Sequence, residues 1–161
     1  MIFVSVGTHE QPFDRLLREI DSLIENGTIR DRVFAQTGHS AYIPKKYKYK
    51  NFLDLNEFDK NIKKCTLFIT HAGEGNIGTG LQFEKKMIVI PRRKKFGEHT
   101  NDHQLELAQA IKKEGQAIVI ESEKEIKSAI KNAWSLKTKK TMHAKSIISE
   151  IEKFISKEMI K

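Results

Sequence analysis

Short apolar runs alternate with longer amphipathic stretches along the chain. The runs predict β-strands at residues 2–6, 32–36, 51–55, 66–70, 87–90 and 117–120. The stretches between them repeat apolar residues every three or four positions and predict helices over residues 13–26, 57–64, 73–83 and 101–113. Strands that alternate with helices favour an α/β fold, here a single Rossmann-like domain with a mostly parallel, doubly wound sheet.

The C-terminal end continues this pattern as a helical region. Ser122 is a candidate N-cap residue, and Glu125 stands three positions later, where a capping box has its acid. We expect a break near residues 135–140 and a helical segment over about 137–161. Its apolar stripe would pack on the sheet or dock a partner and consists of Ile147, Ile148, Ile151, Phe154 and Ile155. A length of 161 residues predicts one domain over 1–161.

The charge and cysteine content narrow the possible partners and compartment. Lys and Arg outnumber Asp and Glu by 29 to 21, a formal net charge of +8, which favours anionic partners unless the basic face is simply solvated. Cys65 is the single cysteine, so we expect a buried structural thiol and a cytoplasmic protein. The chain shows no signal-peptide pattern and no apolar run of the roughly 20 residues that span a bilayer.

Polar residues and glycines follow the first two predicted strands. Gly7, Thr8 and His9 come after the first, and Thr37 and Gly38 after the second. In doubly wound sheets, ligands bind beyond the carboxyl ends of the strands, and glycine lets the backbone approach them closely. Both segments are therefore candidate ligand contacts, and an ordinary strand-to-helix turn is the alternative for each.

A glycine-rich segment joins the strand at 66–70 to the next helix. Its candidate site residues are His71, Ala72, Gly73, Glu74, Gly75, Asn76 and Thr79. The N–H groups and positive dipole end of a helix start can bind a diphosphate. The segment has neither the GxGxxG fingerprint after the first strand nor a P-loop lysine, so we expect no cofactor and no NTPase activity. The alternative is that the glycines serve tight helix–strand packing.

A long polar loop follows the strand at 87–90, where substrate groups are commonly bound. Its candidate residues are Glu98, His99, Asn101, Asp102, His103 and Gln104. The two histidines are four positions apart, but no third ligand has a recognisable spacing, so no metal is expected. The basic run at 92–95 is either solvated or faces an anion such as an acidic membrane surface.

The motifs at residues 4–8, 12–16, 36–38, 69–73 and 98–104 follow a familiar order. Over about residues 1–120, the sequence resembles the C-terminal, donor-binding half of family 28 glycosyltransferases. It is most similar to single-domain subunits from bacterial capsule and exopolysaccharide clusters, relatives of the catalytic subunit of the dolichol-linked GlcNAc transferase. The resemblance implies the C-terminal half of a GT-B fold. It also implies inverting, metal-independent transfer of a hexose from a UDP-sugar to an undecaprenyl-diphosphate-linked sugar.

The resemblance also implies residue roles. The helix after Gly73 would face the donor pyrophosphate, with Thr8 beside it, and Asp102, His103 and Gln104 would contact the donor sugar. One position departs from the family pattern, because Thr79 stands where the peptidoglycan GlcNAc transferase has a ribose-binding glutamate. Thr79 would hold the ribose more weakly, or Glu74 or Glu84 would take over this role.

An acceptor-binding domain is also implied, and 161 residues leave no room for one. We therefore expect a membrane-anchored acceptor-binding partner that holds the chain at the inner face of the plasma membrane and brings the lipid-linked saccharide. His9 is the candidate general base. A non-catalytic UDP-sugar-binding or regulatory subunit is the alternative. Residues 45–50 interleave two tyrosines with lysines, but no nucleic-acid module accompanies this segment, so no nucleic acid is expected.

Overall fold

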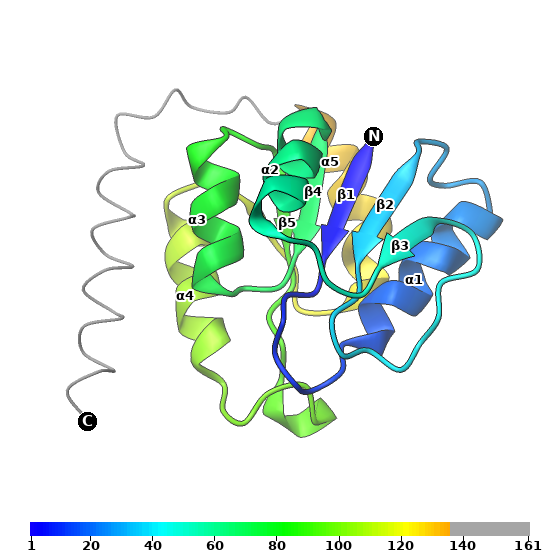
Figure 1. Ribbon diagram of the computed structural model, residues 1–161. Coiled ribbons are helices and arrows are strands. Elements are labelled where there is room, and N and C mark those ends of the chain that lie inside the picture. Colours follow the sequence, from blue (N-terminus) through cyan, green and yellow to red (C-terminus); the bar gives the residue numbers. More distant parts are fainter. Residues whose placement is uncertain (136–161) are drawn as a thin grey trace.

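A six-stranded, all-parallel sheet forms the centre of the computed structural model, which describes residues 1–135 (Figure 1). The strands are β1 (Ile2–Ser5), β2 (Val33–Gln36), β3 (Lys48–Lys50), β4 (Leu67–Thr70), β5 (Met87–Val89) and β6 (Ile118–Val119). Their order is β3-β2-β1-β4-β5-β6, and every neighbouring pair is parallel. This order confirms the predicted doubly wound sheet.

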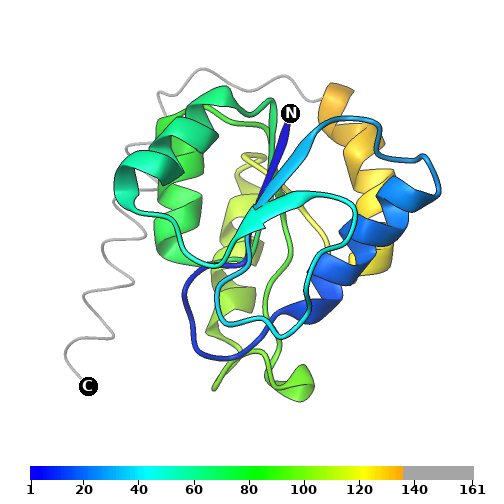
Figure 2. The same cartoon turned by 45° about the vertical axis from the view of Figure 1, so that its right-hand side comes forward.

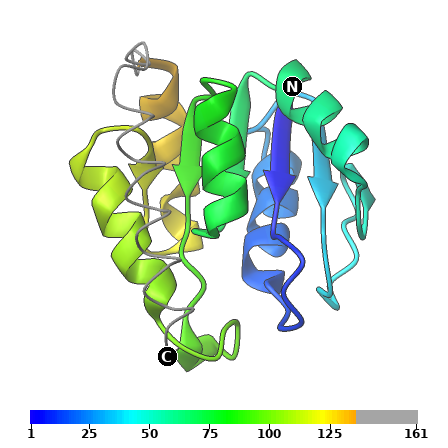
Figure 3. The same cartoon turned by 60° about the vertical axis from the view of Figure 1, so that its left-hand side comes forward.

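Helices cover both faces of the sheet (Figures 2 and 3). The helices are α1 (Asp14–Glu25), α2 (Leu55–Lys64), α3 (Glu74–Gln82), α4 (His103–Lys113) and α5 (Ile126–Ser135). Two short 3-10 turns, η1 (Lys94–Phe96) and η2 (Glu123–Glu125), precede α4 and α5. Helices α1 and α5 lie on one face, and α2, α3 and α4 on the other, so the strands between them are buried on both sides.

Alternate residues of the central strands supply the two halves of the core. In β1, Ile2 and Val4 pack towards α1 and α5, whereas Phe3 packs on the opposite side. The Phe3 ring stacks on that of Phe68 in β4, with the ring centroids 5.4 Å apart. Burial on both faces explains why these strands are continuous apolar runs.

The third strand differs from the prediction. The strand expected at 51–55 is wrong: β3 lies at Lys48–Lys50, and α2 begins at Leu55. Asp54 caps α2, because its side chain accepts a hydrogen bond from the Glu57 N–H at 2.8 Å. The side chain of Leu55 is 86% exposed, so its apolar character does not mark a buried strand. The residues of β3 are all exposed at the sheet edge and lack an apolar pattern.

The capping box at the start of the last helical region is confirmed. The Ser122 hydroxyl accepts a hydrogen bond from the Lys124 N–H, and the Glu125 carboxylate accepts one from the Ser122 N–H at 2.9 Å. The helical segment predicted over about 137–161 lies outside the described residues. Between residues 1 and 135, no helix is long and apolar enough to cross a membrane.

Candidate active site

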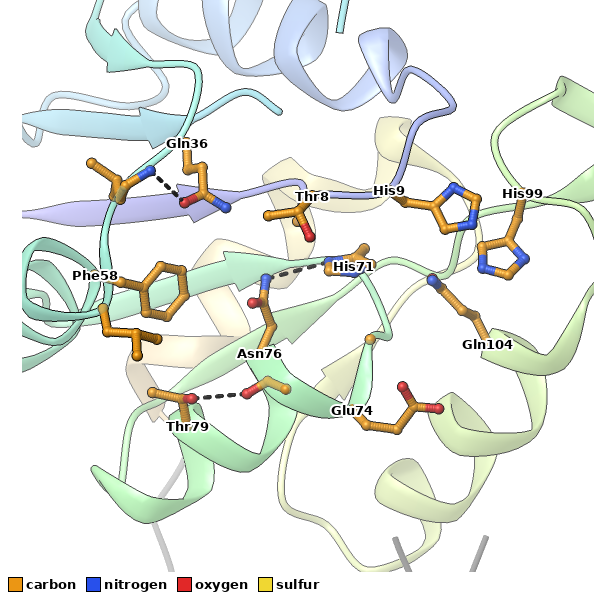
Figure 4. A pocket seen from close by; sticks show the side chains of 15 residues that line it. Thr8, His9, Gln36, Phe58, His71, Glu74, Asn76, Thr79, His99 and Gln104 are labelled. Atoms are coloured by element: carbon orange, nitrogen blue, oxygen red, sulfur yellow. Dashed lines mark hydrogen bonds between the residues drawn. The ribbon is translucent and has the colours of Figure 1, made fainter. Parts of the chain in front are cut away.

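A pocket of about 450 Å³ lies beyond the carboxyl ends of β1, β2 and β4 (Figure 4). The order of the strands reverses between β1 and β4, and ligands of doubly wound folds bind at this switch point. The lining residues are Gly7, Thr8, His9, Gln36, Leu53, Leu55, Phe58, His71, Gly73, Glu74, Gly75, Asn76, Thr79, His99 and Gln104. The fold therefore brings together eleven of the residues that the sequence predicted as site residues.

Hydrogen bonds between polar side chains fix the floor of this pocket. The Asn76 amide nitrogen, in the first turn of α3, donates to the Ser5 hydroxyl at 2.9 Å and to the Thr70 hydroxyl at 2.7 Å. The Thr70 hydroxyl in turn donates to the Ser5 carbonyl at 2.9 Å. Because Ser5 and Thr70 are paired neighbours at the ends of β1 and β4, these bonds hold the start of α3 against both strands.

The His71 ring fills the space between two glycines. A Cβ on Gly7 would lie 2.5 Å from the ring Cε1, and a Cβ on Gly73 would lie 2.8 Å from the same atom. Gly7 also has a φ of +80°, which favours glycine. Both glycines are thus required by packing, and both also line the pocket. Burial lowers the pKa of His71 to about 3, and the nearby Arg92 charge acts in the same direction, so the ring is neutral.

Two loops meet at the far end of the pocket through a pair of histidines. His9 follows β1, His99 follows β5, and their rings stack with centroids 4.3 Å apart. Burial lowers the pKa of His9, and the neighbouring His99 and Arg92 lower it further. Gln104 lies beside them and binds the Arg92 N–H through its oxygen, so its amide nitrogen is the group that faces the ring cluster (Figure 4).

Several nominated residues lie outside this pocket. They are Thr37, Gly38, Ala72, Glu98, Asn101, Asp102 and His103. Glu98 is buried and forms an ion pair with Arg15, with Nε and Oε1 2.6 Å apart. The Asp102 carboxylate accepts a hydrogen bond from the Lys94 N–H at 3.0 Å. These carboxylates organise their own loop, and their contact with a donor stays a prediction.

The interpretation of residues 92–95 as a surface run is wrong for Arg92, which is fully buried. Its guanidinium donates to the carbonyls of Val6 at 2.6 Å, Gln11 at 2.6 Å and Glu98 at 2.9 Å. Lys94 and Lys95 are exposed, as expected of a solvated run. Four consecutive basic residues gave no signal that one of them is buried.

Residues 1–159 match the glycosyltransferase family 28 C-terminal domain. The chain belongs to this family. Human UDP-N-acetylglucosamine transferase subunit ALG13 is 33% identical over 128 residues, which cover 71% of this chain and 10% of the human protein. The mouse protein of the same name is 29% identical over 125 residues, covering 70% and 10%. The chain thus spans about a tenth of the length of these curated relatives.

Solved glycosyltransferase structures share the fold of this family 28 domain. An NMR solution structure of ALG13 superposes with a TM-score of 0.63 at 19% identity, covering 93% of this chain and 94% of that one. The glycotransferase of kitacinnamycin gives 0.63 at 18%, covering 94% and 38%. MurG from Acinetobacter baumannii gives 0.57 at 13%, covering 83% and 41%. The predicted equivalence to the C-terminal half of a GT-B glycosyltransferase is confirmed at the level of fold.

The sequence pattern did not predict one wall of the family 28 pocket. Leu55 and Phe58 come from the first turn of α2, Leu53 lies just before this helix, and Gln36 ends β2. The wrong strand assignment at 51–55 concealed the apolar wall. From the motif at residues 36–38, only Thr37 and Gly38 are named as candidate ligand contacts. The member of that motif that lines the pocket is Gln36, a polar residue at the carboxyl end of an apolar strand. Its side-chain oxygen accepts a hydrogen bond from the Leu53 N–H at 3.1 Å, which ties the two segments together.

The position that departs from the family pattern has a defined geometry. The Thr79 hydroxyl donates to the Gly75 carbonyl at 2.8 Å, so its oxygen remains available only as an acceptor. Of the two acids considered as substitutes, Glu74 lines the pocket and Glu84 does not. Within residues 1–135, no group of three or more His, Cys, Asp or Glu side chains is arranged to hold a metal ion.

Proposed function

We propose that this chain is the donor-binding and catalytic subunit of an inverting glycosyltransferase. It would transfer a hexose from a UDP-sugar to an undecaprenyl-diphosphate-linked sugar in capsule or exopolysaccharide synthesis. One observation carries the proposal: the pocket joins an apolar wall from α2 to the glycine-rich start of α3 and then to a cluster of histidines. The apolar wall suits the uracil ring of the donor, the start of α3 suits its diphosphate, and the histidine cluster suits its sugar.

The start of α3 is suited to the diphosphate. The N–H groups of a first helical turn have no partner within the helix and carry its positive dipole end. Gly73 and Gly75 leave this backbone open to the pocket. As the bond between the anomeric carbon and the phosphate oxygen breaks, negative charge develops on the departing diphosphate, and fixed N–H dipoles stabilise it without rearrangement.

The acceptor hydroxyl must lose a proton as its oxygen attacks the anomeric carbon. His9 is the candidate base on this chain, because its lowered pKa keeps the imidazole neutral and able to accept a proton. Substitution of His9 by alanine should then lower kcat with little effect on UDP affinity. A wild-type kcat in the His9→Ala variant, measured with the partner present, would exclude this role.

We also propose that a membrane-anchored subunit binds the acceptor and holds this chain at the inner face of the plasma membrane. Leu55 at the pocket rim is 86% exposed, and Phe52 nearby is 47% exposed, so apolar surface stands uncovered beside the site. Exposed apolar groups at a pocket rim suit a protein interface. The curated relatives are themselves named as subunits.

A subunit that binds the donor without catalysing transfer is the second candidate. Among the residues described as lining the pocket, Glu74 is the only carboxylate, and it lies where the diphosphate is expected. Apart from the histidines, the described residues that line the pocket therefore bring no base to the sugar end. Transfer measured with purified chain and a lipid-linked acceptor separates the two candidates, since any turnover by this chain alone requires a base of its own.

Donor binding is tested by thermal unfolding with UDP, UDP-sugars and ADP. A ligand at a hundredfold excess over its Kd adds about 2.7 kcal/mol to the free energy of unfolding. We expect uridine nucleotides to raise the melting temperature and the Leu55→Ala variant to weaken this shift. Ile43→Ala is the control, because Ile43 is also exposed, at 65%, but lies outside the pocket. If no uridine nucleotide stabilises the protein, the proposed function is wrong.

A further inference from the structure

The Arg92 guanidinium is a buried positive charge without an ion-pair partner in residues 1–135. Its three hydrogen bonds go to backbone carbonyls, and its Nε has no hydrogen-bond partner in the described part of the chain. The carboxylate of Glu98, six residues later, turns instead to Arg15, with contacts of 2.6 and 3.1 Å. Burial lowers the pKa of Arg92 to about 10, which leaves the side chain charged at neutral pH.

A buried cation that no carboxylate contacts carries a desolvation penalty. The carbonyl dipoles, the Phe13 ring at 5.1 Å and the more distant Glu98 charge offset this penalty only in part. A function of this charge would explain why an arginine is buried here. Arg92 lies outside the lining of the pocket, yet its charge lowers the pKa of both His71 and His9, which line it. The positive charge of Arg92 thus influences the electrostatics of the pocket although the side chain does not line it.

The same three hydrogen bonds connect the loops that end the pocket. Val6 and Gln11 bracket the loop that carries His9, and Glu98 directly precedes His99. The guanidinium therefore holds the backbone on both sides of the stacked histidine rings. The other charged groups that act on His9 are His99, which lowers its pKa, and Glu10, which raises it.

We propose that Arg92 is a positioning residue for a nucleoside diphosphate in this pocket. Without touching the ligand, the guanidinium joins the two loops that carry His9 and His99. It also places a positive charge next to His71, whose ring packs on Gly73 at the start of α3, where the diphosphate is expected. This inference rests on the proposed function, since it assumes that the anion is the donor's diphosphate. It assigns the electrostatic attraction for that anion to a buried residue in addition to the start of α3.

Three variants separate the charge from the geometry. Arg92→Gln removes both the charge and the hydrogen bonds, whereas Arg92→Lys keeps the charge but cannot reach three carbonyls. Lys94→Gln is the control, because it removes an exposed charge from the same loop. We would measure the Kd of UDP and of inorganic pyrophosphate by calorimetry, the pKa of His9 by NMR, and the contact between the His9 and His99 rings by nuclear Overhauser effects.

Arg92→Gln should weaken UDP binding by about tenfold or more, whereas Lys94→Gln should change it by less than about twofold. The pKa of His9 should rise in Arg92→Gln and stay low in Arg92→Lys, and the contact between the rings should be lost in both. If the role of Arg92 were purely structural, both variants would have a lower melting temperature, and the pKa of His9 would not differ between them. Equal UDP affinities for Arg92→Gln and Lys94→Gln would overturn the inference.

Two further outcomes are informative. If wild-type protein binds neither UDP nor pyrophosphate, the proposed function fails, whereas binding that is insensitive to Arg92 overturns only the inference. If neither Arg92 variant folds, the wild-type side chain is observed directly. Its guanidinium NMR signals should be protected from solvent exchange and should shift when UDP saturates the protein, while those of exposed Arg30 should not. Unshifted Arg92 signals would overturn the inference.

Discussion

The packing of His71 between two glycines makes Gly73→Ala an informative substitution. The backbone at Gly73 has φ −91° and ψ 138°, which any residue adopts, so the new methyl group causes no backbone strain. It would lie 2.8 Å from Cε1 of His71 and closer still to Nε2. Gly7 lies against the same ring, so the ring can move away from the new methyl group only towards the pocket. Overpacking of this kind costs about 1–3 kcal/mol.

Gly75→Ala is the matched control, two residues further along the same helix start. A Cβ on Gly75 meets no atom of residues 1–135 within 4 Å, so alanine should raise the free energy of unfolding by up to about 1 kcal/mol through helix propensity. Urea unfolding followed by circular dichroism measures both variants without ligand. The two free energies should differ by about 1.5–4 kcal/mol. Equal unfolding midpoints for Gly73→Ala and Gly75→Ala would refute the packing argument.

Three other groups give predictions that need no ligand. The NMR signals of His71 should remain those of a neutral ring well below pH 6.5; its pKa is about 3 in the folded protein, so stability should fall as the pH drops from 6.5 towards 3. The Cys65 thiol is 3% exposed and burial raises its pKa, so a thiol reagent should modify it only after unfolding. The Tyr42 phenol donates to Asp21 at 2.6 Å, which raises its pKa to about 12. Its contribution to stability should be complete below pH 10 and lost as the pH rises through 12, and Asp21→Asn should bring the absorbance titration of Tyr42 closer to pH 10.

The fold could be predicted because its central strands are buried on both faces. Continuous apolar runs such as Leu67–Thr70, separated by amphipathic helices, leave few alternatives to a parallel sheet. The same reasoning fails for β3, because Lys48–Lys50 are exposed at the sheet edge and need no apolar side chains there. The apolar residues that follow it belong to a pocket rim, for which apolar periodicity gives no signal.

The site could be predicted in part for a similar reason. The rule that ligands bind at carboxyl strand ends locates Gly7, His71 and Gly73 from the sequence, because these positions depend only on the strand order. It does not show which polar groups are already bound within the protein. Glu98 and Arg92 lie in one loop of opposite charges. Only the tertiary structure shows that Glu98 pairs with Arg15 and that Arg92 binds backbone carbonyls.

The hydrogen-bonded floor formed by Ser5, Thr70 and Asn76 has a kinetic consequence. These bonds, and the ring wedged between glycines beside them, complete the shape of the pocket during folding. An arriving ligand should therefore meet a preformed pocket, and little conformational entropy should be lost on association. The rate of encounter should then be governed by diffusion and by long-range charge, and should fall as ionic strength rises.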